Sequence, residues 1–336
     1  MRVIRQSVAR ARRDGEAQAV FGASPFLADP WPGWQPAAAA EQVLQELPAE
    51  ASLWALAADG NWQWAAVTVP LEFDTRLFGV PVRRLWPLAH RRPWPEPESL
   101  EQGRHLLREL VAAERAEGCR CLMARVPARD FAAAQVLEEV GARLVDVSVE
   151  WLRALEDLPA PPTPPPGYEI RPWRPGEEEA LKTLAARAFC DLDAYADRFA
   201  LDPRLRPHCP RMYRRWVANS LSGELADQVL VLERNGQTAG FITLKLPPGG
   251  EGPGADCAWV VMNAIAPAHR GRGLYHHLLA RGLDWLRRHG ARRVRVRTKL
   301  SQQAVIRAWS ALGARQAYAD LTFHLWQETA GQGSNP

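Results

Sequence analysis

Residues 265–279 read IAPAHRGRGLYHHLL, and this stretch decides the fold. An apolar run, 259–265, ends at Pro267, and two arginines then alternate with two glycines before a helix-patterned segment, 274–289. A strand that leads through a glycine-rich turn into a helix points several backbone N–H groups and the positive end of the helix dipole at one place. Glycine takes positive φ and lets an anion approach the backbone, and arginine adds charge-assisted donors. The stretch therefore predicts a phosphate-binding loop.

Two other phosphate loops are excluded by their own requirements. A nucleoside triphosphate loop ends in Gly-Lys-Ser/Thr, and no lysine stands here. The dinucleotide fingerprint needs a third glycine, where this chain has His276, and an acid about 20 residues further on, where it has arginines. The loop resembles the Arg-x-x-Gly-x-Gly/Ala loop of the GNAT acetyltransferases, which holds the pyrophosphate of coenzyme A. Arg270 and Gly273 match that motif, and Tyr275 stands at its last small position.

The chain contains one segment twice, at an offset of 172 residues. Residues 118–151 overlay residues 290–323 without a gap, and the triplet Gly-Ala-Arg at 141–143 recurs at 313–315. Both copies have the pattern strand, turn, helix, glycine, strand, and a glycine after each helix suits a left-handed cap. An internal repeat of this kind predicts two related α/β halves.

The two copies differ at the predicted phosphate loop. Residues 270–273 read RGRG in the second copy, and residues 98–101 read ESLE in the first. Two acidic side chains repel a polyphosphate, so we expect the first copy to lack the cofactor. The predicted fold class is α/β (α+β), with tandem GNAT-like domains, each a mixed sheet flanked by helices, and a degenerate N-terminal copy. A single domain with a chance repeat is the alternative.

Prolines mark the clearest domain boundary. The linker at 158–167 reads LPAPPTPPPG, and so many prolines cannot pair in a sheet and favour stiff polyproline II. We therefore predict an N-terminal extension at 1–45, the degenerate domain at 46–157, the catalytic domain at 168–328 and a disordered tail at 329–336.

Composition narrows the class of protein. The sequence has no run of about 18 apolar residues, which a membrane span needs, and its basic start lacks the apolar stretch of a signal peptide. A net charge of +4 is too small to indicate nucleic acid. Five cysteines show no CxxC pair, so we expect no metal, and free thiols fit a reducing cytoplasm. We expect a cytoplasmic protein and leave a homodimer open.

Within the GNAT superfamily, the chain resembles the TDP-fucosamine (TDP-4-amino-sugar) N-acetyltransferases over roughly residues 72–326. The residues that carry this resemblance are Phe78, Gly79, Phe199, Asp202, Pro203, Tyr213 and Trp216. Such enzymes carry a degenerate GNAT-like domain beside an active one. The resemblance implies acetyl-coenzyme A as cosubstrate and direct attack of an acceptor amine on its thioester. It also implies a nucleotide-linked amino sugar as the small-molecule acceptor.

The resemblance further implies the binding residues. Coenzyme A is expected on the strand end, the loop and the start of the last helix, at Asn263, Ala264, Ile265, His269, Arg270, Gly271, Arg272, Gly273, Leu274 and Gln302. The helix pair that follows the first strand covers the acceptor side in this fold. The acceptor pocket is therefore expected at Phe189, Arg198, Phe199, Tyr213 and Trp216.

The catalytic groups depart from the family pattern. The usual acid is a tyrosine four residues before the glycine of the last helix, and this chain has Trp309 there. Tyr318 and Tyr275 are the candidate acids in its place, with water as the alternative. Asp256, at the start of the central strand, is the candidate base, with Glu251 just before it.

Three functions stay open at this point. The first is acetyl transfer to a nucleotide-linked amino sugar. The second keeps the chemistry but takes an amine of a protein, peptide or antibiotic. The third is an acyl-coenzyme A-binding module without turnover, which Trp309 favours.

Overall fold

The structure is a computed structural model, which describes the chain except for residues 25–35, 93, 193–194, 250–254 and 328–336. The chain divides into two compact units. Unit 1 contains residues 1–147 and 318–336, and unit 2 contains residues 148–317. The predicted tail at 329–336 lies outside the described residues.

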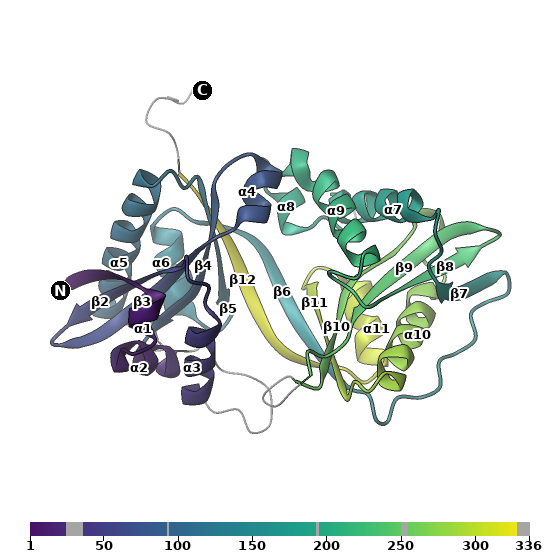
Figure 1. Cartoon of the computed structure of the whole chain (residues 1–336), viewed down its shortest axis with the longest axis horizontal. Coiled ribbons are helices and arrows are strands. Elements are labelled where there is room, and N and C mark those ends of the chain that lie inside the picture. The colour runs from purple at the N-terminus through teal and green to yellow at the C-terminus, as the bar shows by residue number, and fades with distance from the viewer. Residues whose placement is uncertain (25–35, 93, 193–194, 250–254, 328–336) are drawn as a thin grey trace. The chain divides into compact units, whose positions relative to one another are not determined.

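Unit 1 is a sheet with helices packed on both faces (Figure 1). Its strands, in their order across the sheet, are β1 (Arg2–Ser7), β2 (Ser52–Ala58), β3 (Asn61–Pro70), β4 (Val82–His90), β5 (Cys121–Pro127) and part of β12 (Arg315–Trp326). Its helices are α1 (Val8–Ala11), α2 (Gly15–Ala23), α3 (Pro36–Glu46), α4 (Glu72–Phe78), α5 (Pro97–Ala116) and α6 (Phe131–Glu139). β4 and β5 run parallel, and the other pairs are antiparallel.

Both faces of this sheet are buried, which explains why its strands read as nearly continuous apolar runs. Successive side chains of β2 point to opposite faces. Leu53 packs in the cluster that holds Phe21 of α2, whereas Trp54 packs in the cluster beneath α5 and α6.

The N-terminal residues differ from the predicted extension. β1 pairs with β2 along its whole length, and Phe21 and Leu44 are buried in the core of unit 1. The sequence hides this part of the fold because α1 is a single turn and the apolar residues of α2 lie all around the helix. The described part of residues 1–45 therefore belongs to unit 1.

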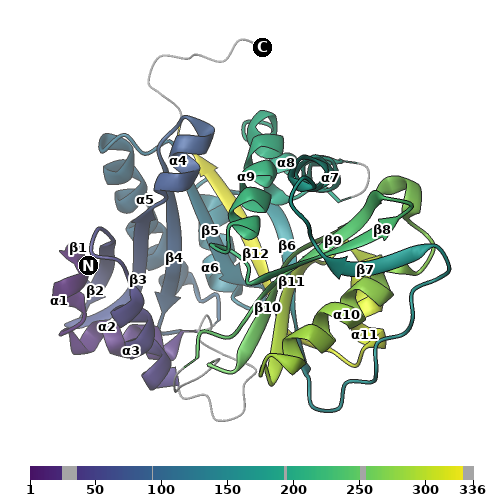
Figure 2. The same cartoon turned by 45° about the vertical axis from the view of Figure 1, so that its right-hand side comes forward.

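The strands of unit 2 run in mixed directions, and α7 and α9 cover one face of them and α10 and α11 the other (Figure 2). Its strands, in order, are β7 (Tyr168–Pro172), β8 (Gln228–Arg234), β9 (Gln237–Lys245), β10 (Cys257–Ile265), β11 (Arg293–Lys299) and part of β6 (Arg143–Ala154). Its helices are α7 (Glu178–Cys190), α8 (Arg198–Leu201), α9 (Cys209–Leu221), α10 (Leu274–Arg288) and α11 (Gln303–Ala311), with short 3₁₀ turns at Arg206–His208 and Pro267–His269.

The final strand of each sequence copy completes the sheet of the other unit. β6 follows the helices of the first copy, yet its residues 148–154 pair with β11 of unit 2. β12 ends the second copy, yet its residues 320–326 pair with β5 of unit 1. The units thus divide within β6 and β12, whereas the predicted boundary lay in the linker at 158–167, which forms no helix or strand. Side-chain patterns show that a strand exists but not which strand pairs with it.

The repeat is also visible in the backbone. Gly118 and Gly290 occupy matching positions and have φ of 86° and 88°. Gly141 and Gly313, which follow the helices α6 and α11, have φ of 90° and 75°. Left-handed glycines therefore end equivalent helices in both copies.

Candidate active site

The loop that leads into α10 is built on two left-handed glycines. Gly271 has φ of 75°, and Gly273, which caps α10, has φ of 72°. A Cβ added at either position would meet no atom within 4 Å. Backbone conformation, and not crowding, is therefore what requires glycine here.

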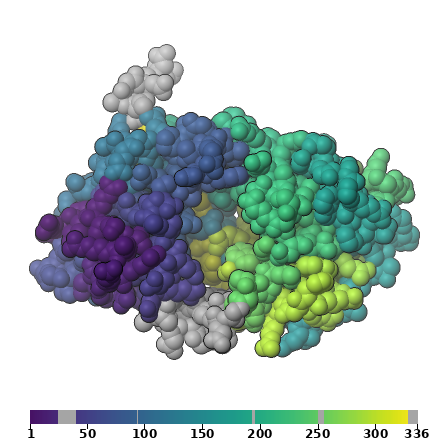
Figure 3. All heavy atoms as spheres, in the orientation of Figure 1, coloured from purple at the N-terminus to yellow at the C-terminus, as the bar shows by residue number. Residues whose placement is uncertain are grey.

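Three successive backbone N–H groups of this loop are free. Those of Gly271, Arg272 and Gly273 have no hydrogen-bond acceptor within the described part of the chain. All three residues are exposed, and the yellow-green atoms of α10 lie at the surface in Figure 3. The first turn of α10 adds its own free N–H groups and the positive end of its dipole. This arrangement fits a pyrophosphate.

Arg270 turns its side chain back toward the protein. Its Nε donates to the carbonyl oxygen of Ile265 at 3.1 Å, and its guanidinium lies 4.5 Å from the centre of the Tyr195 ring. Asp191 lies 3.8 Å from Nη1, and the buried Nη2 has no partner among the described residues. Arg270 thus holds the loop against the end of β10, a role that differs from the direct phosphate contact implied by the motif.

β10 and β11 separate soon after they meet. They pair in parallel from Cys257 to Trp259, opposite Arg293 to Arg295. A bulge between Val260 and Met262 then interrupts the register of β10 with β9, and the described residues show no further pairing of β10 with β11. The two strands therefore leave an opening at their carboxyl ends.

The backbone of β10 faces this opening. The N–H of Ala266 donates to Ala239 of β9 at 2.8 Å. Because alternate residues of a strand direct their hydrogen-bonding groups the same way, Asn263 and Ile265 direct theirs to the β11 side. These are two of the residues predicted for coenzyme A, and they suit an extended ligand lying along the strand.

The position of the usual acid is occupied by a buried indole. Trp309 is 0% exposed, and its Nε1 donates to the hydroxyl of Tyr275 at 3.2 Å. Burial raises the pKa of Tyr275, and the nearby Tyr195 acts in the same direction, whereas the Trp309 hydrogen bond opposes the shift. Tyr275 therefore stays protonated at neutral pH.

His269 belongs to a small basic cluster beside the loop. Its Nδ1 lies 2.9 Å from the hydroxyl of Tyr168, whose ring lies 5.1 Å from the Arg234 guanidinium. Burial, together with the charges of Arg234 and Arg272, lowers the pKa of His269. Sequence reasoning missed Tyr168 and Arg234, since both come from strands far from the motif.

The residues predicted for the acceptor gather in one cluster. Phe189 stacks on Tyr213 with ring centres 4.4 Å apart, and Trp216 meets Tyr213 and Phe199 edge to face at 5.3 and 6.5 Å. The guanidinium of Arg198 lies 4.1 Å from the centre of the Phe199 ring.

At the centre of this cluster lies a carboxylate that the sequence did not single out. Asp197 accepts hydrogen bonds from the Tyr213 hydroxyl and from the backbone N–H of Arg198. Phe199 and Tyr213 are 2% and 3% exposed, so these two rings pack beneath the acceptor side and do not form its surface.

The other predicted site residues lie in different settings. Gln302 caps α11, and its N–H donates to Lys299 at the end of β11. Leu274 and Ala264 have buried side chains. The backbone N–H of Leu274 lies at the start of α10, whereas the backbone groups of Ala264 face β9.

Two further predicted catalytic residues lie at other places in the chain. Asp256 precedes β10, at the opposite end of the strand from the loop, and is ion-paired with Arg293. Tyr318 belongs to unit 1. Glu251 lies outside the described residues.

In unit 1 the corresponding position has no loop. Residues 98–101, which align with 270–273, already belong to α5. Gly103 aligns with Tyr275, and a Cβ placed on it would come within 2.8 Å of the Trp64 ring. The Nε1 of Trp64 donates to the hydroxyl of Ser99 at 3.2 Å. The indole thus packs beneath the start of the helix.

A buried pair lies beside this indole. His90 and Asp130 are both 0% exposed and lie 2.7 Å apart, and Asp130 aligns with Gln302. The rings of Trp64 and His90 lie 4.4 Å apart. Side chains of unit 1 therefore fill the place that corresponds to the opening in unit 2.

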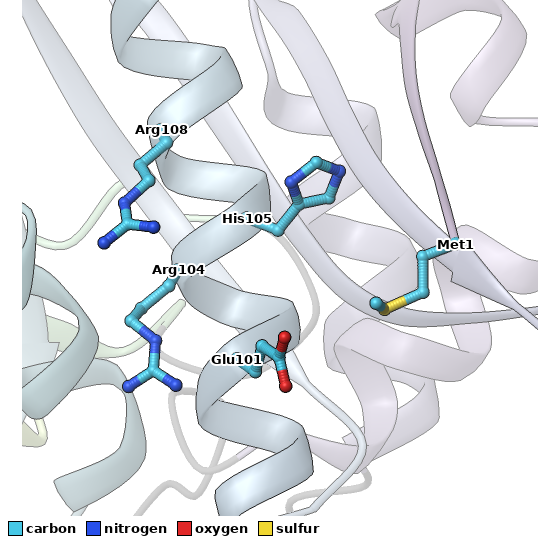
Figure 4. Close-up of a pocket in the computed structure, with 5 residues that line it drawn as sticks. All are labelled: Met1, Glu101, Arg104, His105 and Arg108. Carbon is cyan, nitrogen blue, oxygen red and sulfur yellow. The ribbon is translucent and has the colours of Figure 1, made fainter.

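A separate hollow of about 310 Å³ opens on unit 1 (Figure 4). It is lined by Met1, Glu101, Arg104, His105 and Arg108. Arg104 and Arg108 project from α5 away from Met1, and Arg104 is ion-paired with Glu139 at 2.7 Å. Its lining side chains are of mixed charge and indicate no particular ligand. Among the described residues, no cluster of three or more His, Cys, Asp or Glu is placed to hold a metal ion.

A family comparison agrees with this geometry. Residues 192–314 match the model of the acetyltransferase (GNAT) family. Residues 192–314 therefore resemble a GNAT acetyltransferase domain. The match covers α8, α9, the glycine loop and α11, and GNAT proteins are acyltransferases that use acetyl-coenzyme A as cosubstrate.

Curated relatives resemble the chain at low identity. The spore coat polysaccharide biosynthesis protein SpsD of Bacillus subtilis is 27% identical over 210 residues, 61% of this chain and 66% of that protein. The mycothiol acetyltransferase of Cellulomonas flavigena is 28% identical over 188 residues, 54% of this chain and 51% of that protein. The streptothricin acetyltransferase of Streptomyces lavendulae is 27% identical over 184 residues, 50% of this chain and 91% of that protein. The chain thus spans less than two thirds of the first two.

Solved structures share the fold over nearly the whole chain. A GCN5-related N-acetyltransferase from Sphaerobacter thermophilus has a TM-score of 0.64 at 20% identity, covering 96% of this chain and 95% of that one. A tandem GNAT protein from the clavulanic acid biosynthesis pathway has a TM-score of 0.55 at 17% identity, covering 98% and 99%. The predicted fold class, with its tandem GNAT arrangement, is confirmed. None of the described helices has the length and apolar character that a bilayer span demands.

Proposed function

We propose that the protein is an N-acetyltransferase that moves the acetyl group of acetyl-coenzyme A directly to a primary amine. The observation that carries this proposal is the row of free N–H groups at Gly271, Arg272 and Gly273, at the start of α10. A row of such donors at a helix start suits the pyrophosphate of the cosubstrate.

Unit 2 supplies the rest of the binding site. When bound, acetyl-coenzyme A supplies an activated thioester. Asn263 and Ile265 orient its extended arm through their backbone groups, in the opening between β10 and β11. Arg270 fixes the loop to the strand end, and neutral His269 offers a further donor beside it.

Tyr275 is the proton donor that we assign for the leaving thiolate. Its raised pKa keeps the proton on the hydroxyl, and the Trp309 N–H fixes the position of the oxygen without taking that proton. Trp309, which stands at the position of the usual tyrosine, thus acts as a positioning group for Tyr275 of α10. Tyr318 as the acid and Asp256 as the base stay predictions, and the ion pair with Arg293 does not favour Asp256.

The acceptor that we favour is a nucleotide-linked amino sugar, as in the TDP-4-amino-sugar N-acetyltransferases. The relatives bear names that refer to polysaccharide biosynthesis, mycothiol and streptothricin, which support a small-molecule amine. Arg198 and the partly buried Trp216 offer a cation and an aromatic ring on the acceptor side. We further propose that the protein acts in the cytoplasm, and a homodimer stays open.

The alternatives are an amine of a protein, peptide or antibiotic, and an acyl-coenzyme A-binding module without turnover. Incubating the purified protein with labelled acetyl-coenzyme A separates them. The acceptor panel contains nucleotide-linked amino sugars, free amino sugars, peptides and an aminoglycoside, and released thiol is followed in parallel. We expect the label on a nucleotide-linked amino sugar, and none with Arg270→Glu as the control. Label on peptides or the aminoglycoside alone selects the second function. Binding without transfer selects the third.

A further inference from the structure

Two cysteines meet at the ends of α7 and α9. Cys190 is the last residue of α7 and Cys209 the first residue of α9. Both are free thiols, and their Sγ atoms lie 2.7 Å apart. Non-bonded heavy atoms pack at about 3.5–4.0 Å, and a disulfide bond is about 2.0 Å long. The two sulfurs are therefore closer than an ordinary contact and need little movement to bond.

The two sulfurs differ in access. Cys209 is 0% exposed, whereas Cys190 is partly exposed. The adjacent Cys190 thiol and burial both raise the pKa of Cys209. A reagent in solution therefore reaches Cys190 first, and the buried Cys209 remains a thiol at that stage.

We propose that Cys190 and Cys209 form a reversible disulfide, which makes this pair a redox-sensitive modification site of unit 2. The oxidant is a low-molecular-weight disulfide. The Cys190 thiolate attacks one of its sulfurs, forms a mixed disulfide and releases one small thiol. Cys209 then loses its proton and attacks the Cys190 sulfur, which releases the second small thiol. Two protein thiols are oxidised, and one small disulfide is reduced to two thiols.

The other cysteines lack this arrangement. Cys119 donates to the backbone oxygen of Cys121 at 3.5 Å instead of approaching its sulfur. Burial raises the pKa of Cys119 to about 11 and that of Cys257 to about 12. Both thiols are buried, so a small disulfide in solution does not reach them as it reaches Cys190.

The bond would close residues 191–208 into a loop on the acceptor side. This segment carries Tyr195, which packs under Arg270, and Ala196, whose carbonyl oxygen accepts from Lys299 at the end of β11. A covalent closure restricts the freedom of such a segment. We expect oxidation to change the KM for the acceptor more than the Kd for coenzyme A. This consequence rests on the proposed function, whereas the disulfide does not.

Counting thiols tests the disulfide directly. Fully reduced protein has five cysteines, and incubation with oxidised glutathione at mildly alkaline pH is expected to leave three titratable thiols after unfolding. A non-reducing peptide map is expected to show the Cys190 and Cys209 peptides joined, and dithiothreitol to separate them. The melting temperature of the oxidised protein is expected to rise by a few degrees.

Matched variants locate the bond. Cys190→Ser and Cys209→Ser should each abolish the joined peptide, while Cys257→Ser should keep it. Five thiols at every glutathione concentration, a glutathione adduct that persists on Cys190, or a bond to another cysteine would each overturn the proposal. Should a serine variant fail to fold, the peptide map of the unaltered protein still decides. If the bond forms and the acceptor KM does not change, the disulfide stands and its link to the acceptor side falls.

Discussion

At the scale of single residues, the proposed proton transfer to the thiolate rests on Trp309 and Tyr275. A tryptophan cannot donate a proton to a thiolate as the family's tyrosine does, and this made catalysis doubtful from sequence. The structure joins the two side chains, with the Trp309 Nε1 donating to Tyr275 at 3.2 Å. The hydroxyl keeps its own proton, because burial raises the pKa of Tyr275. The departure at position 309 is therefore compatible with general acid catalysis.

Replacing Tyr275 by phenylalanine tests this assignment. We expect kcat to fall by about 100- to 10,000-fold, the usual worth of a general acid, with little change in the Kd for coenzyme A. The protonated hydroxyl is the active form, and activity is lost only as the pH rises through its pKa. Because that pKa lies above the ordinary value, kcat of the unaltered protein should show no alkaline fall below about pH 10.

The matching change at Tyr318 is the control for this prediction. If Tyr275→Phe keeps the full rate and Tyr318→Phe loses it, Tyr318 is the donor. If both variants keep the full rate, water protonates the thiolate. Thermal unfolding checks that the loss of the Trp309 acceptor has not destabilised the variant.

At the scale of elements, the loop before α10 depends on backbone conformation and charge together. Gly271 and Gly273 both need positive φ, and the free N–H groups follow from that conformation. Arg270 closes the loop onto Ile265 and Tyr195. A single substitution can therefore disrupt either the backbone conformation of the loop or the electrostatic potential that favours an anion there.

Charge reversal in the loop should abolish binding of coenzyme A. Arg270→Glu removes the bond to Ile265 and places a carboxylate near the phosphate, and Gly273→Asp puts an acid at a left-handed position. We expect each variant to lose more than about 100-fold in affinity by calorimetry, about 3 kcal/mol, because an acid near the phosphate repels it and the loop is disturbed. Arg187→Glu on the exposed side of α7 reverses the same charge away from the loop and should bind normally. A folded loop variant with normal affinity would place the cofactor elsewhere.

At the scale of the whole molecule, the GNAT-like fold occurs in both units, whereas the predicted cofactor loop belongs to unit 2. In unit 1, α5 runs through the positions of the loop, and Trp64, His90 and Asp130 fill the space beside it. All three side chains are buried. The first sequence copy still contributes to unit 2, because residues 148–154 of β6 pair with β11 there.

Calorimetry with acetyl-coenzyme A is expected to give one site per chain. The reason is steric as well as electrostatic. In unit 1, α5 takes the place of the loop, and its residues 98 and 101 are acidic. Arg270→Glu should remove the whole binding signal. A second site, or a residual half of the signal in that variant, would contradict the degenerate assignment of unit 1.

Local patterns in the sequence were enough to find the repeat, the glycine loop and the order of strands and helices within the repeated segments. These features depend on side-chain period and on glycine conformation, which neighbouring residues determine. Of the residues predicted to line the acceptor pocket, Phe189, Tyr213 and Trp216 pack together. Their role toward an acceptor stays a prediction.

Only the tertiary structure decided which strands pair and which side chains meet. The exchange of β6 and β12, the place of residues 1–24 in the core and the contact between Trp309 and Tyr275 all join segments far apart in the chain. Such contacts follow from packing and hydrogen bonding in the folded state, and no local pattern encodes them. For the same reason the sequence offered Asp256 as a base, without showing that Arg293 already holds its carboxylate.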